Sequence, residues 1–302
     1  MAKYYCILFD ADNTLLNFDA AESKALAETL VNYGIEPDAE TVQTYRTINE
    51  ELWRQLEKGQ IRREKLLNER FSRFLKAIDA AGDGAEMNRY YLEQLSTHPD
   101  LMNAEVLDVL RELSEVATLA VVSNGVHKVQ IRRLAESGVS NFMEDVFISE
   151  KLGCEKPGAR IFDTALRALG VENREHVLMV GDSLTSDIQG GANAGLDTCW
   201  FNPGNVENKT GITPKFTVGS YEDLYREVGL LNEAMKTEKY ANARAFLSVV
   251  VGNALSFSSK VFHSASGYTY RQFSIPFVMT KCSPKSSRNL AGMISRPLAS
   301  IL

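Results

Sequence analysis

The clearest pattern near the start of the chain is an apolar run that ends in two carboxylates. Residues 4–9 are apolar or aromatic without a break, which is typical of a strand buried on both faces in a parallel sheet. The run is far shorter than the roughly 20 residues of a membrane span. Ligands of open α/β sheets bind at the carboxyl ends of the strands, so we expect Asp10 and Asp12 to lie at a functional site.

Helical periodicity replaces the strand pattern over residues 17–96. Apolar residues recur there at helical spacing, and glycines or a proline separate the segments. We interpret the aromatic and apolar stripes as the core of a helical bundle that is inserted after the first strand. The predicted helices cover residues 19–33, 37–59, 66–78 and 86–95.

Helices and apolar strands alternate from residue 103 onward. The predicted strands cover residues 117–122, 146–148, 177–180, 198–201 and 216–218. The predicted helices cover residues 106–113, 127–137, 161–169, a stretch through Ile188, and 221–231. This alternation predicts an α/β fold, a doubly wound parallel sheet with right-handed crossovers and helices on both faces, which carries the all-helical insert.

The composition changes near residues 231–240. No acidic residue follows Glu238, whereas basic residues and serines continue toward the end of the chain. We therefore predict that residues 232–302 form a basic, Ser-rich extension that is weakly ordered and dispensable for catalysis. The alternative is a basic tail that binds an acidic partner or a membrane surface.

Composition also narrows the functional classes. A formal net charge of −6 argues against nucleic acid as the main partner. The four cysteines form no CxxC pair, which argues against zinc and disulfide frameworks and favours the reducing cytoplasm. The sequence has no apolar stretch long enough for a membrane span, and we expect no signal peptide.

Polar residues suited to phosphate chemistry follow three of the predicted strands. Two carboxylates two residues apart repel each other unless a cation lies between them, and Mg²⁺ prefers such oxygen ligands. Phosphoryl transfer needs a nucleophile, charge neutralisation and positioning. A carboxylate that becomes an aspartyl-phosphate, Mg²⁺ and a lysine would meet these needs. The candidates are Asp10, Asp12 and Thr14 after the first strand, Ser123, Asn124 and Gly125 after the second, Lys156 before a helix, and Asp182 and Asp187 after the fourth.

In order and spacing, these residues resemble the four motifs of the haloacid dehalogenase (HAD) superfamily of phosphohydrolases. The motifs are Asp10-x-Asp12-x-Thr14, Ser123-Asn124, Lys156-Pro157 and Gly181-Asp182-x4-Asp187. The resemblance implies a Rossmann-like HAD core formed by residues 1–16 and 97–231, and a helical cap formed by residues 17–96. The extension over residues 232–302 lies outside the resemblance.

The resemblance also implies a catalytic role for three residues. Asp10 would attack phosphorus as the nucleophile. Asp12 would protonate the leaving oxygen and then activate the water that releases phosphate. Lys156 would neutralise the nucleophile and bind the phosphate.

Metal and phosphate ligands follow from the same resemblance. Asp182 would complete the Mg²⁺ shell together with Asp10 and the backbone carbonyl of Asp12. Asp187 would be an indirect or water-mediated metal ligand that also orients Lys156. Ser123 and the amides of Asn124 and Gly125 would hold the phosphoryl oxygens, and Thr14 is a further candidate for phosphate binding.

Several of these residues also have a simpler structural interpretation. Ser123 could cap the helix that follows it, and Asp187 could serve the dipole of its own helix. Lys156 could lie in solvent as an ordinary surface lysine. Thr14 is typical of a donor in a structural turn.

Finer features resemble the noncanonical pyrimidine 5′-nucleotidase branch of the superfamily. They are the stretches 148–157 and 182–191 and, in the cap, Leu52-Trp53, Glu57-x-Gly59 and Arg70-Phe71. The resemblance implies a small phosphomonoester substrate, a pyrimidine nucleoside 5′-monophosphate. Its base could stack on a cap aromatic, and the candidates are Tyr45, Trp53, Phe71 and Phe74.

Other functions remain open at this stage. A sugar-phosphate phosphatase or a phosphosugar mutase could share the same core. Haloacid dehalogenation needs no acid at the second position, so Asp12 argues against it. A binding protein without activity would not need the full motif set. We expect a monomer or a homodimer.

Overall fold

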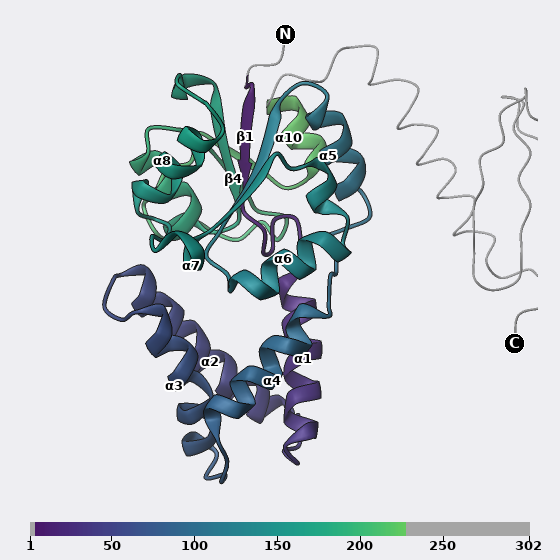
Figure 1. Ribbon diagram of the computed structural model, residues 1–302, viewed down its shortest axis with the longest axis vertical. Coiled ribbons are helices and arrows are strands. Elements are labelled where there is room, and N and C mark those ends of the chain that lie inside the picture. Colours follow the sequence, from purple (N-terminus) through teal and green to yellow (C-terminus); the bar gives the residue numbers. More distant parts are fainter. Residues whose placement is uncertain (1–3, 228–302) are drawn as a thin grey trace, which may run out of the picture. The chain divides into compact units, whose positions relative to one another are not determined.

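The structure, a computed structural model, describes residues 4–227. A sheet with helices on both faces lies next to a separate group of four helices (Figure 1). The predicted extension over residues 232–302 lies outside the described residues, as does the predicted end of the last helix. None of the helices in the described range combines the length and hydropathy that crossing a bilayer requires.

The helices and strands follow the predicted order, with boundaries close to those that the pattern indicates. The strands are β1 (Cys6–Phe9), β2 (Thr118–Ser123), β3 (Asp145–Ile148), β4 (Val177–Gly181), β5 (Asp197–Phe201) and β6 (Phe216–Val218). The inserted helices are α1 (Phe18–Asn32), α2 (Ala39–Glu57), α3 (Arg63–Ala77) and α4 (Gly84–Ser96). The helices around the sheet are α5 (Val106–Ser114), α6 (His127–Glu136), α7 (Ser149–Leu152), α8 (Ala159–Ala168), α9 (Gln189–Asn193) and α10 (Tyr221–Glu227).

The described strands form one parallel sheet in the order β3-β2-β1-β4-β5-β6. β1 lies at the centre, so Leu8 has Ala120 on one side and Met179 on the other. The chain winds outward from β1 in both directions, which is the doubly wound arrangement. The predicted fold class is therefore confirmed.

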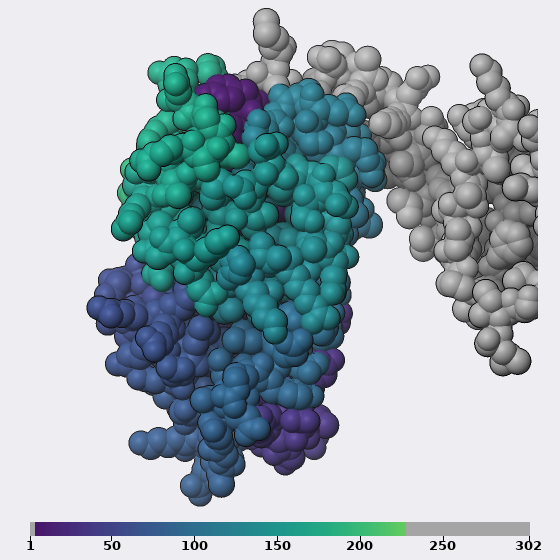
Figure 2. All heavy atoms as spheres, in the orientation of Figure 1, coloured from purple at the N-terminus to yellow at the C-terminus, as the bar shows by residue number. Residues whose placement is uncertain are grey.

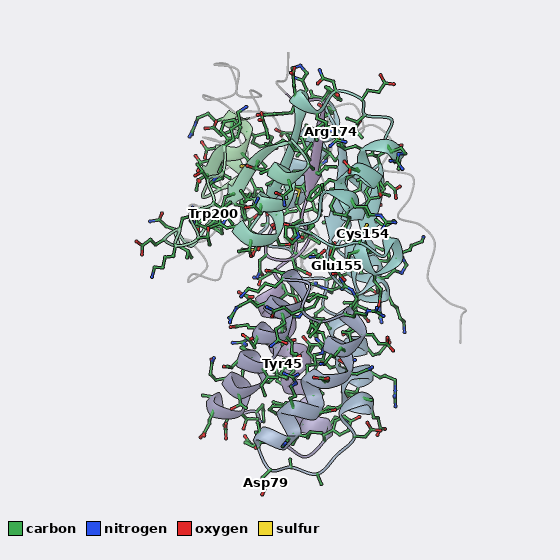
Figure 3. The ribbon with its side chains drawn as sticks, turned by 90° about the vertical axis from the view of Figure 1, so that its left-hand side faces the viewer. Tyr45, Asp79, Cys154, Glu155, Arg174 and Trp200 are labelled. Carbon is green, nitrogen blue, oxygen red and sulfur yellow. The ribbon has the colours of Figure 1, made fainter. Side chains whose placement is uncertain are left out.

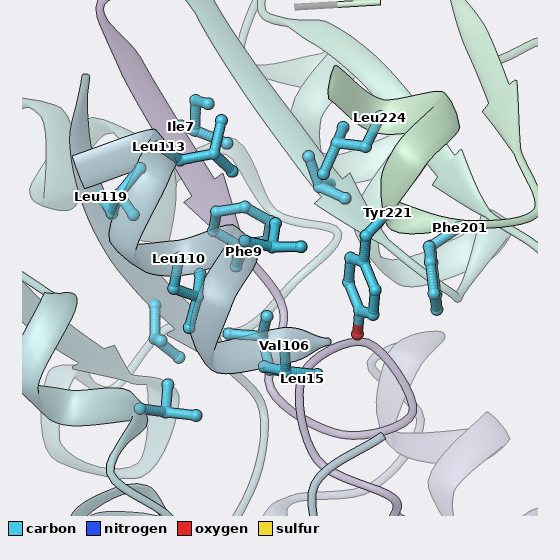
Figure 4. Close-up of a cluster of buried hydrophobic side chains, with 14 of the residues drawn as sticks. Ile7, Phe9, Leu15, Val106, Leu110, Leu113, Leu119, Phe201, Tyr221 and Leu224 are labelled. Atoms are coloured by element: carbon cyan, nitrogen blue, oxygen red, sulfur yellow. The ribbon is translucent and has the colours of Figure 1, made fainter. Parts of the chain in front are cut away.

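Side chains of β1 alternate between the two faces of the sheet, as the strand period of two requires. Ile7 and Phe9 pack with residues of α5 and α10 on one face (Figure 4). Cys6 and Leu8 pack with residues of α8 on the other face. Both faces are therefore buried, which explains why the strand contains no polar residue.

Helices α1 to α4, called the four-helix unit below, have an aromatic core of their own. Tyr45, Phe71 and Phe74 are fully buried there, and the rings of Tyr45 and Phe71 lie 4.8 Å apart. Figure 3 shows Tyr45 inside this unit. Asp38 and Asp83 cap α2 and α4 by accepting hydrogen bonds from backbone N–H groups. The predicted stripes thus form a bundle core, whereas the assignment of a cap domain stays a prediction.

Candidate active site

Three central strands bring the predicted polar residues to one edge of the sheet. Asp10 follows β1, Ser123 ends β2, and Asp182 follows β4. These strands are parallel neighbours, so their carboxyl ends meet at the same edge. Segments that are more than 50 residues apart in the sequence therefore contribute to one site.

Lys156 binds two of the predicted carboxylates at this edge. Its Nζ atom donates to Asp10 Oδ1 at 2.5 Å and to Asp187 Oδ1 at 2.7 Å. The third hydrogen bond goes to the carbonyl oxygen of Val122 at 2.7 Å. An ammonium group has three donors, all three are used, and the side chain is only 2% exposed. The interpretation of Lys156 as a surface lysine is therefore wrong.

The carboxylates at this edge are buried close to one another. Burial raises the pKa of Asp10 to about 7; Lys156 opposes this shift, and repulsion from Asp187 and Asp12 adds to it. Burial also raises the pKa of Asp182 well above its usual range, together with repulsion from Asp10. For Lys156, burial alone would lower the pKa, but Asp10 and Asp187 raise it above its usual range. One lysine thus does not balance the negative charge of the three carboxylates. A bound cation would lower the free-energy cost of keeping them ionised.

Three carboxylates are placed to share a cation. Asp10, Asp182 and Asp187 each offer an oxygen atom, and these atoms lie within 4.8 Å of one another. Oxygen ligands at such spacing suit a hard cation such as Mg²⁺. Trp200 on β5 donates its Nε1–H to the Asp182 carbonyl oxygen at 2.7 Å, which holds the backbone of this candidate ligand in place.

Asp187 enters the cluster from a π-helical turn over Leu184–Ile188, where the sequence predicts a regular helix. Its Oδ2 atom accepts a hydrogen bond from the Ser183 N–H at 3.0 Å, while Oδ1 binds Lys156. A Cβ atom at Gly181 would lie 2.3 Å from Asp187 Oδ2, so only glycine leaves room for this carboxylate. The turn directs Asp187 inward, and a role in the helix dipole alone does not account for its position.

Asp12 is held by two residues of α6 that the sequence analysis missed. Arg133 Nη1 donates to Asp12 Oδ1 at 2.5 Å, and Gln130 Nε2 donates to Asp12 Oδ2 at 2.6 Å. Arg133 is fully buried. The sequence pattern did contain a hint of these buried residues. The polar residues 130 and 133 lie on the same helix face as Val129 and Leu134. A polar pair on an apolar face indicates a buried partner, but not which one.

The turn after β2, residues 123–125, is fixed by a side chain of α6 and by the backbone of Lys156. Ser123 Oγ accepts hydrogen bonds from Gln130 Nε2 at 2.9 Å and from the Gly125 N–H at 3.0 Å. Asn124 exchanges two hydrogen bonds of 2.9 Å with the backbone of Lys156. The residue before α6 is Val126, which offers no side-chain cap, and the His127 N–H donates instead to Glu150 Oε2 at 2.6 Å. The interpretation of Ser123 as a helix cap is therefore wrong.

A cavity of about 1180 Å³ extends from this edge to the four-helix unit. Both parts of the molecule contribute to its walls, and Figure 2 shows the four-helix unit (dark blue) against the sheet-bearing part (teal). The predicted site residues that line the cavity are Asp10, Asp12, Ser123, Asn124, Gly125, Lys156, Asp182 and Asp187.

Thr14 is the predicted site residue that does not line the cavity. It is fully buried, and its carbonyl oxygen accepts a hydrogen bond from the Tyr221 hydroxyl. Its own hydroxyl has no hydrogen-bond partner among the described residues. This placement is that of a residue inside the turn after β1.

One of the four aromatic residues proposed to face a base lines the cavity. This residue is Trp53 on α2, which is half-buried. Tyr45, Phe71 and Phe74 are fully buried inside the four-helix unit and do not reach the cavity wall. Glu57, one turn beyond Trp53, accepts a hydrogen bond from Thr185 at 3.1 Å and so joins α2 to the sheet edge.

Comparisons with known proteins agree with this geometry. Pyrimidine 5′-nucleotidase PynA of Streptococcus pneumoniae is 39% identical over 223 residues, which are 73% of this chain and 93% of PynA. Pyrimidine 5′-nucleotidase YjjG of Escherichia coli is 33% identical over 222 residues, 74% of this chain and 96% of YjjG. The crystal structure of YfnB from Bacillus subtilis, bound to magnesium, is similar with a TM-score of 0.71 at 37% identity. The aligned region covers 74% of this chain and 98% of the YfnB chain.

The family itself follows from the extent of the match. The model of the haloacid dehalogenase-like hydrolases matches residues 4–195, a range that includes all four motifs. The sheet order, the residues at the sheet edge and the relatives lead to the same result. The chain belongs to the haloacid dehalogenase-like hydrolase family.

Proposed function

We propose that the protein is a Mg²⁺-dependent phosphomonoester hydrolase that acts through an aspartyl-phosphate on Asp10. The observation that carries this proposal is the contact of one buried ammonium, that of Lys156, with Asp10 and Asp187. A carboxylate held by a cation at the wall of a large cavity suits a nucleophile that approaches a negatively charged phosphate.

The donor set fits Mg²⁺. The oxygens of Asp10, Asp182 and Asp187 would hold the ion together with the backbone carbonyl of Asp12. The Asp12 side chain is turned toward Arg133 and Gln130, which is consistent with a backbone role at the metal. The bound ion would supply positive charge that neutralises the phosphate and the carboxylates. YfnB, whose structure was determined with magnesium bound, supports this assignment.

In the proposed reaction, Asp10 attacks phosphorus and the bond to the leaving oxygen breaks. Asp12 donates a proton to that oxygen, and then takes a proton from the water that attacks the aspartyl-phosphate and releases phosphate. Both Asp12 oxygens accept hydrogen bonds in this structure. The carboxyl group must therefore release one of them to reach the substrate. Lys156 stays between Asp10 and Asp187 and stabilises the developing negative charge.

We further propose that the substrate is a nucleoside 5′-monophosphate with a pyrimidine base. Residues 17–96 would act as the cap that holds the leaving group, while the sheet edge holds the phosphate. The exposed part of the Trp53 ring lines the cavity and offers a flat surface on which a base can stack. The names of PynA and YjjG support the same substrate class. The YfnB structure, which reveals interdomain movement, supports a cap that opens and closes.

A phosphate-release screen with and without Mg²⁺ tests this proposal. The substrates are uridine, thymidine and purine 5′-monophosphates and a set of small sugar phosphates. We expect pyrimidine nucleotides to have the highest kcat/KM and chelation of Mg²⁺ to abolish release. A preference for sugar phosphates over every nucleotide would contradict the nucleotidase proposal but leave the phosphatase chemistry intact. Release that is unaffected by chelation would contradict the metal assignment.

A second experiment compares the Mg²⁺ affinity of two variants. Asp10→Asn removes a proposed metal ligand, whereas Asp12→Asn leaves the Asp12 backbone carbonyl in place. We expect Asp10→Asn to weaken Mg²⁺ binding in calorimetry by about ten-fold or more, and Asp12→Asn to weaken it only a few-fold. Equal losses in the two variants would contradict the split between backbone and side chain.

A further inference from the structure

A single side chain of the four-helix unit reaches deep into the turn after β2. Arg63 is the first residue of α3, yet its guanidinium group ends among residues of the sheet-bearing part. Nη1 donates to the carbonyl oxygens of Asn124 at 2.5 Å and Gly125 at 3.3 Å. Nη2 donates to Ser149 Oγ at 2.6 Å and lies 3.4 Å from Glu155 Oε1. Figure 3 shows Glu155 where the two parts of the molecule meet.

The carbonyl groups that Arg63 binds belong to the peptides of the predicted phosphate turn. In a trans peptide the C=O of one residue and the N–H of the next point in opposite directions. Holding the Asn124 carbonyl therefore fixes the direction of the Gly125 N–H, which donates to Ser123 Oγ at 3.0 Å in this structure. Holding the Gly125 carbonyl fixes the direction of the Val126 N–H. Arg63 thus fixes two consecutive peptides of the turn that would receive a phosphoryl group.

A packing role alone does not explain an arginine at position 63, because burying its charge costs free energy. Burial lowers its pKa, and Glu155 and Glu150 oppose that shift. The guanidinium group lies 5.7 Å from the centre of the Trp53 ring, and its Nε atom has no hydrogen-bond partner among the described residues. An apolar side chain of similar size could fill the space without desolvating a charge. The four polar contacts explain why a cation is present instead.

Other ion pairs between the two parts lie at the surface. Glu93 of α4 pairs with Lys128 and Arg132 of α6, and all three side chains are at least 39% exposed. Exposed pairs contribute little and are screened by salt. Arg63, at 8% exposure, forms instead a buried link between the four-helix unit and the phosphate turn.

We propose that Arg63 is a positioning residue that makes the phosphate turn competent only when the four-helix unit is seated on the sheet edge. When the unit moves away, the guanidinium group leaves the carbonyl oxygens and the turn loses its fixed orientation. When the unit returns, the turn regains its fixed orientation. This inference rests on the proposed function, because the turn is assigned there as the phosphate-binding element. It links leaving-group binding in the cap to phosphate binding in the core.

The experiment compares Arg63→Gln and Arg63→Lys with the control Arg62→Gln. Arg62 is the preceding residue, is exposed, and makes no contact with the turn that the structure records. Each variant is assayed with uridine 5′-monophosphate and with ribose 5-phosphate, and its inhibition by orthovanadate is measured at saturating Mg²⁺. Thermal unfolding is followed in parallel. Orthovanadate and ribose 5-phosphate report on the phosphate site without a base.

We expect Arg63→Gln to lower kcat/KM by about 10- to 100-fold for both substrates. Inhibition by orthovanadate should weaken by a similar factor. Arg63→Lys should fall between the wild type and Arg63→Gln, because an ammonium can hold one carbonyl group but cannot bridge four acceptors. Arg62→Gln should stay within about two-fold of the wild type in every assay.

The outcomes separate this inference from the proposed function. Unchanged orthovanadate inhibition in Arg63→Gln, or a loss confined to the nucleotide, would overturn the positioning role. If the wild type hydrolyses neither substrate, the proposed function fails, and calorimetric binding of inorganic phosphate to the same variants still decides the role of Arg63. If Arg63→Gln does not fold, Arg63→Lys decides it by the same measurements.

Discussion

The sheet edge and the four-helix unit both bury charged groups, but they satisfy them differently. At the sheet edge, all three donors of Lys156 have acceptors, and both oxygens of Asp12 accept hydrogen bonds. In the four-helix unit, Arg70 donates from Nε to Asn88 at 2.6 Å. Among residues 4–227, its Nη2 atom and the Tyr91 hydroxyl make no hydrogen bond of ordinary geometry, and the same holds for Arg133 Nη2 at the sheet edge.

The fully matched groups at the sheet edge are Lys156 and the Asp12 carboxylate. A network whose donors and acceptors are all matched has one geometry. Such a fixed geometry suits a reaction whose chemistry is the same for every phosphomonoester. Unmatched buried groups cost stability, and such a cost is tolerated mainly at functional sites. The comparison predicts that substitutions at the sheet edge abolish chemistry or stability. Substitutions in the four-helix unit should change selectivity or have small effects, except at Arg63, whose side chain reaches the turn after β2.

The largest expected effect comes from removing one carboxylate in each region. Asp10→Asn should lower phosphate release by at least about a thousand-fold, because an amide cannot form the acyl-phosphate. Glu22→Gln, at the cavity wall of the four-helix unit, should change release only a few-fold. Both variants are assayed at saturating Mg²⁺ after their circular dichroism spectra are compared. Turnover near the wild-type rate in Asp10→Asn would remove Asp10 from the nucleophile role.

The next largest effect concerns the loss of one ion-pairing cation in each region. Lys156→Met leaves Asp10 and Asp187 buried without their common partner, and we expect the free energy of unfolding to fall by about 3 kcal/mol. In Arg46→Met, which removes the partner of Glu22, the loss should be about 1 kcal/mol or less, because the Arg46 side chain is 33% exposed. Urea denaturation at pH 7 with a chelator measures both values. Equal losses would show that the two regions do not differ in this way.

A smaller effect is expected at the aromatic wall of the cavity. Trp53→Leu should lower kcat/KM for uridine 5′-monophosphate by about ten-fold relative to ribose 5-phosphate, because a base loses its stacking surface. Trp53→Phe should restore most of the ratio. Tyr90→Phe serves as control, since Tyr90 is on α4 but does not line the cavity. An equal loss for both substrates would show that Trp53 supports the phosphate site and does not stack on the base.

The smallest effect is a pH dependence at Glu22. Burial raises the pKa of Glu22 above its ordinary value of 4.5, although Arg46 opposes the shift. Folding therefore favours the protonated form, so this contribution is fully present below the unfolded-state pKa and is lost as the pH rises through the raised folded-state pKa. Glu22→Gln should therefore flatten the stability curve above about pH 4.5. Identical curves for the variant and the wild type would contradict the raised pKa.

Local patterns in the sequence predicted the elements well. The apolar run over residues 4–9 predicted β1, and the position of Asp10 directly after it predicted the sheet edge. Asp38 marks the start of α2, because its side chain caps the first turn. Gly59 marks the end, because a residue with a positive φ, here 66°, commonly follows the last turn of a helix. These signals depend on neighbouring residues, so they can be read without the fold.

The partners of the site residues could not be predicted in the same way. Arg63 and Asn124 are 61 residues apart in the sequence, and Arg133 and Asp12 are 121 residues apart. Many exposed arginines in the chain look the same as these two in a sequence pattern. The packing of α3 and α6 selects which of them reaches the site, and that packing is a property of the whole chain.

The sequence by itself determined the alternation of helices and strands, the parallel sheet, and the set of carboxylates and the lysine that serve the site. Period and motif spacing carry that information over short ranges. Only the tertiary structure decided that Trp53 lines the cavity, that Thr14 does not, and that Arg63 binds the turn after β2. The reason is physical: side-chain contacts between distant segments depend on how whole helices pack, and no local pattern encodes the rotation of a helix against its neighbours.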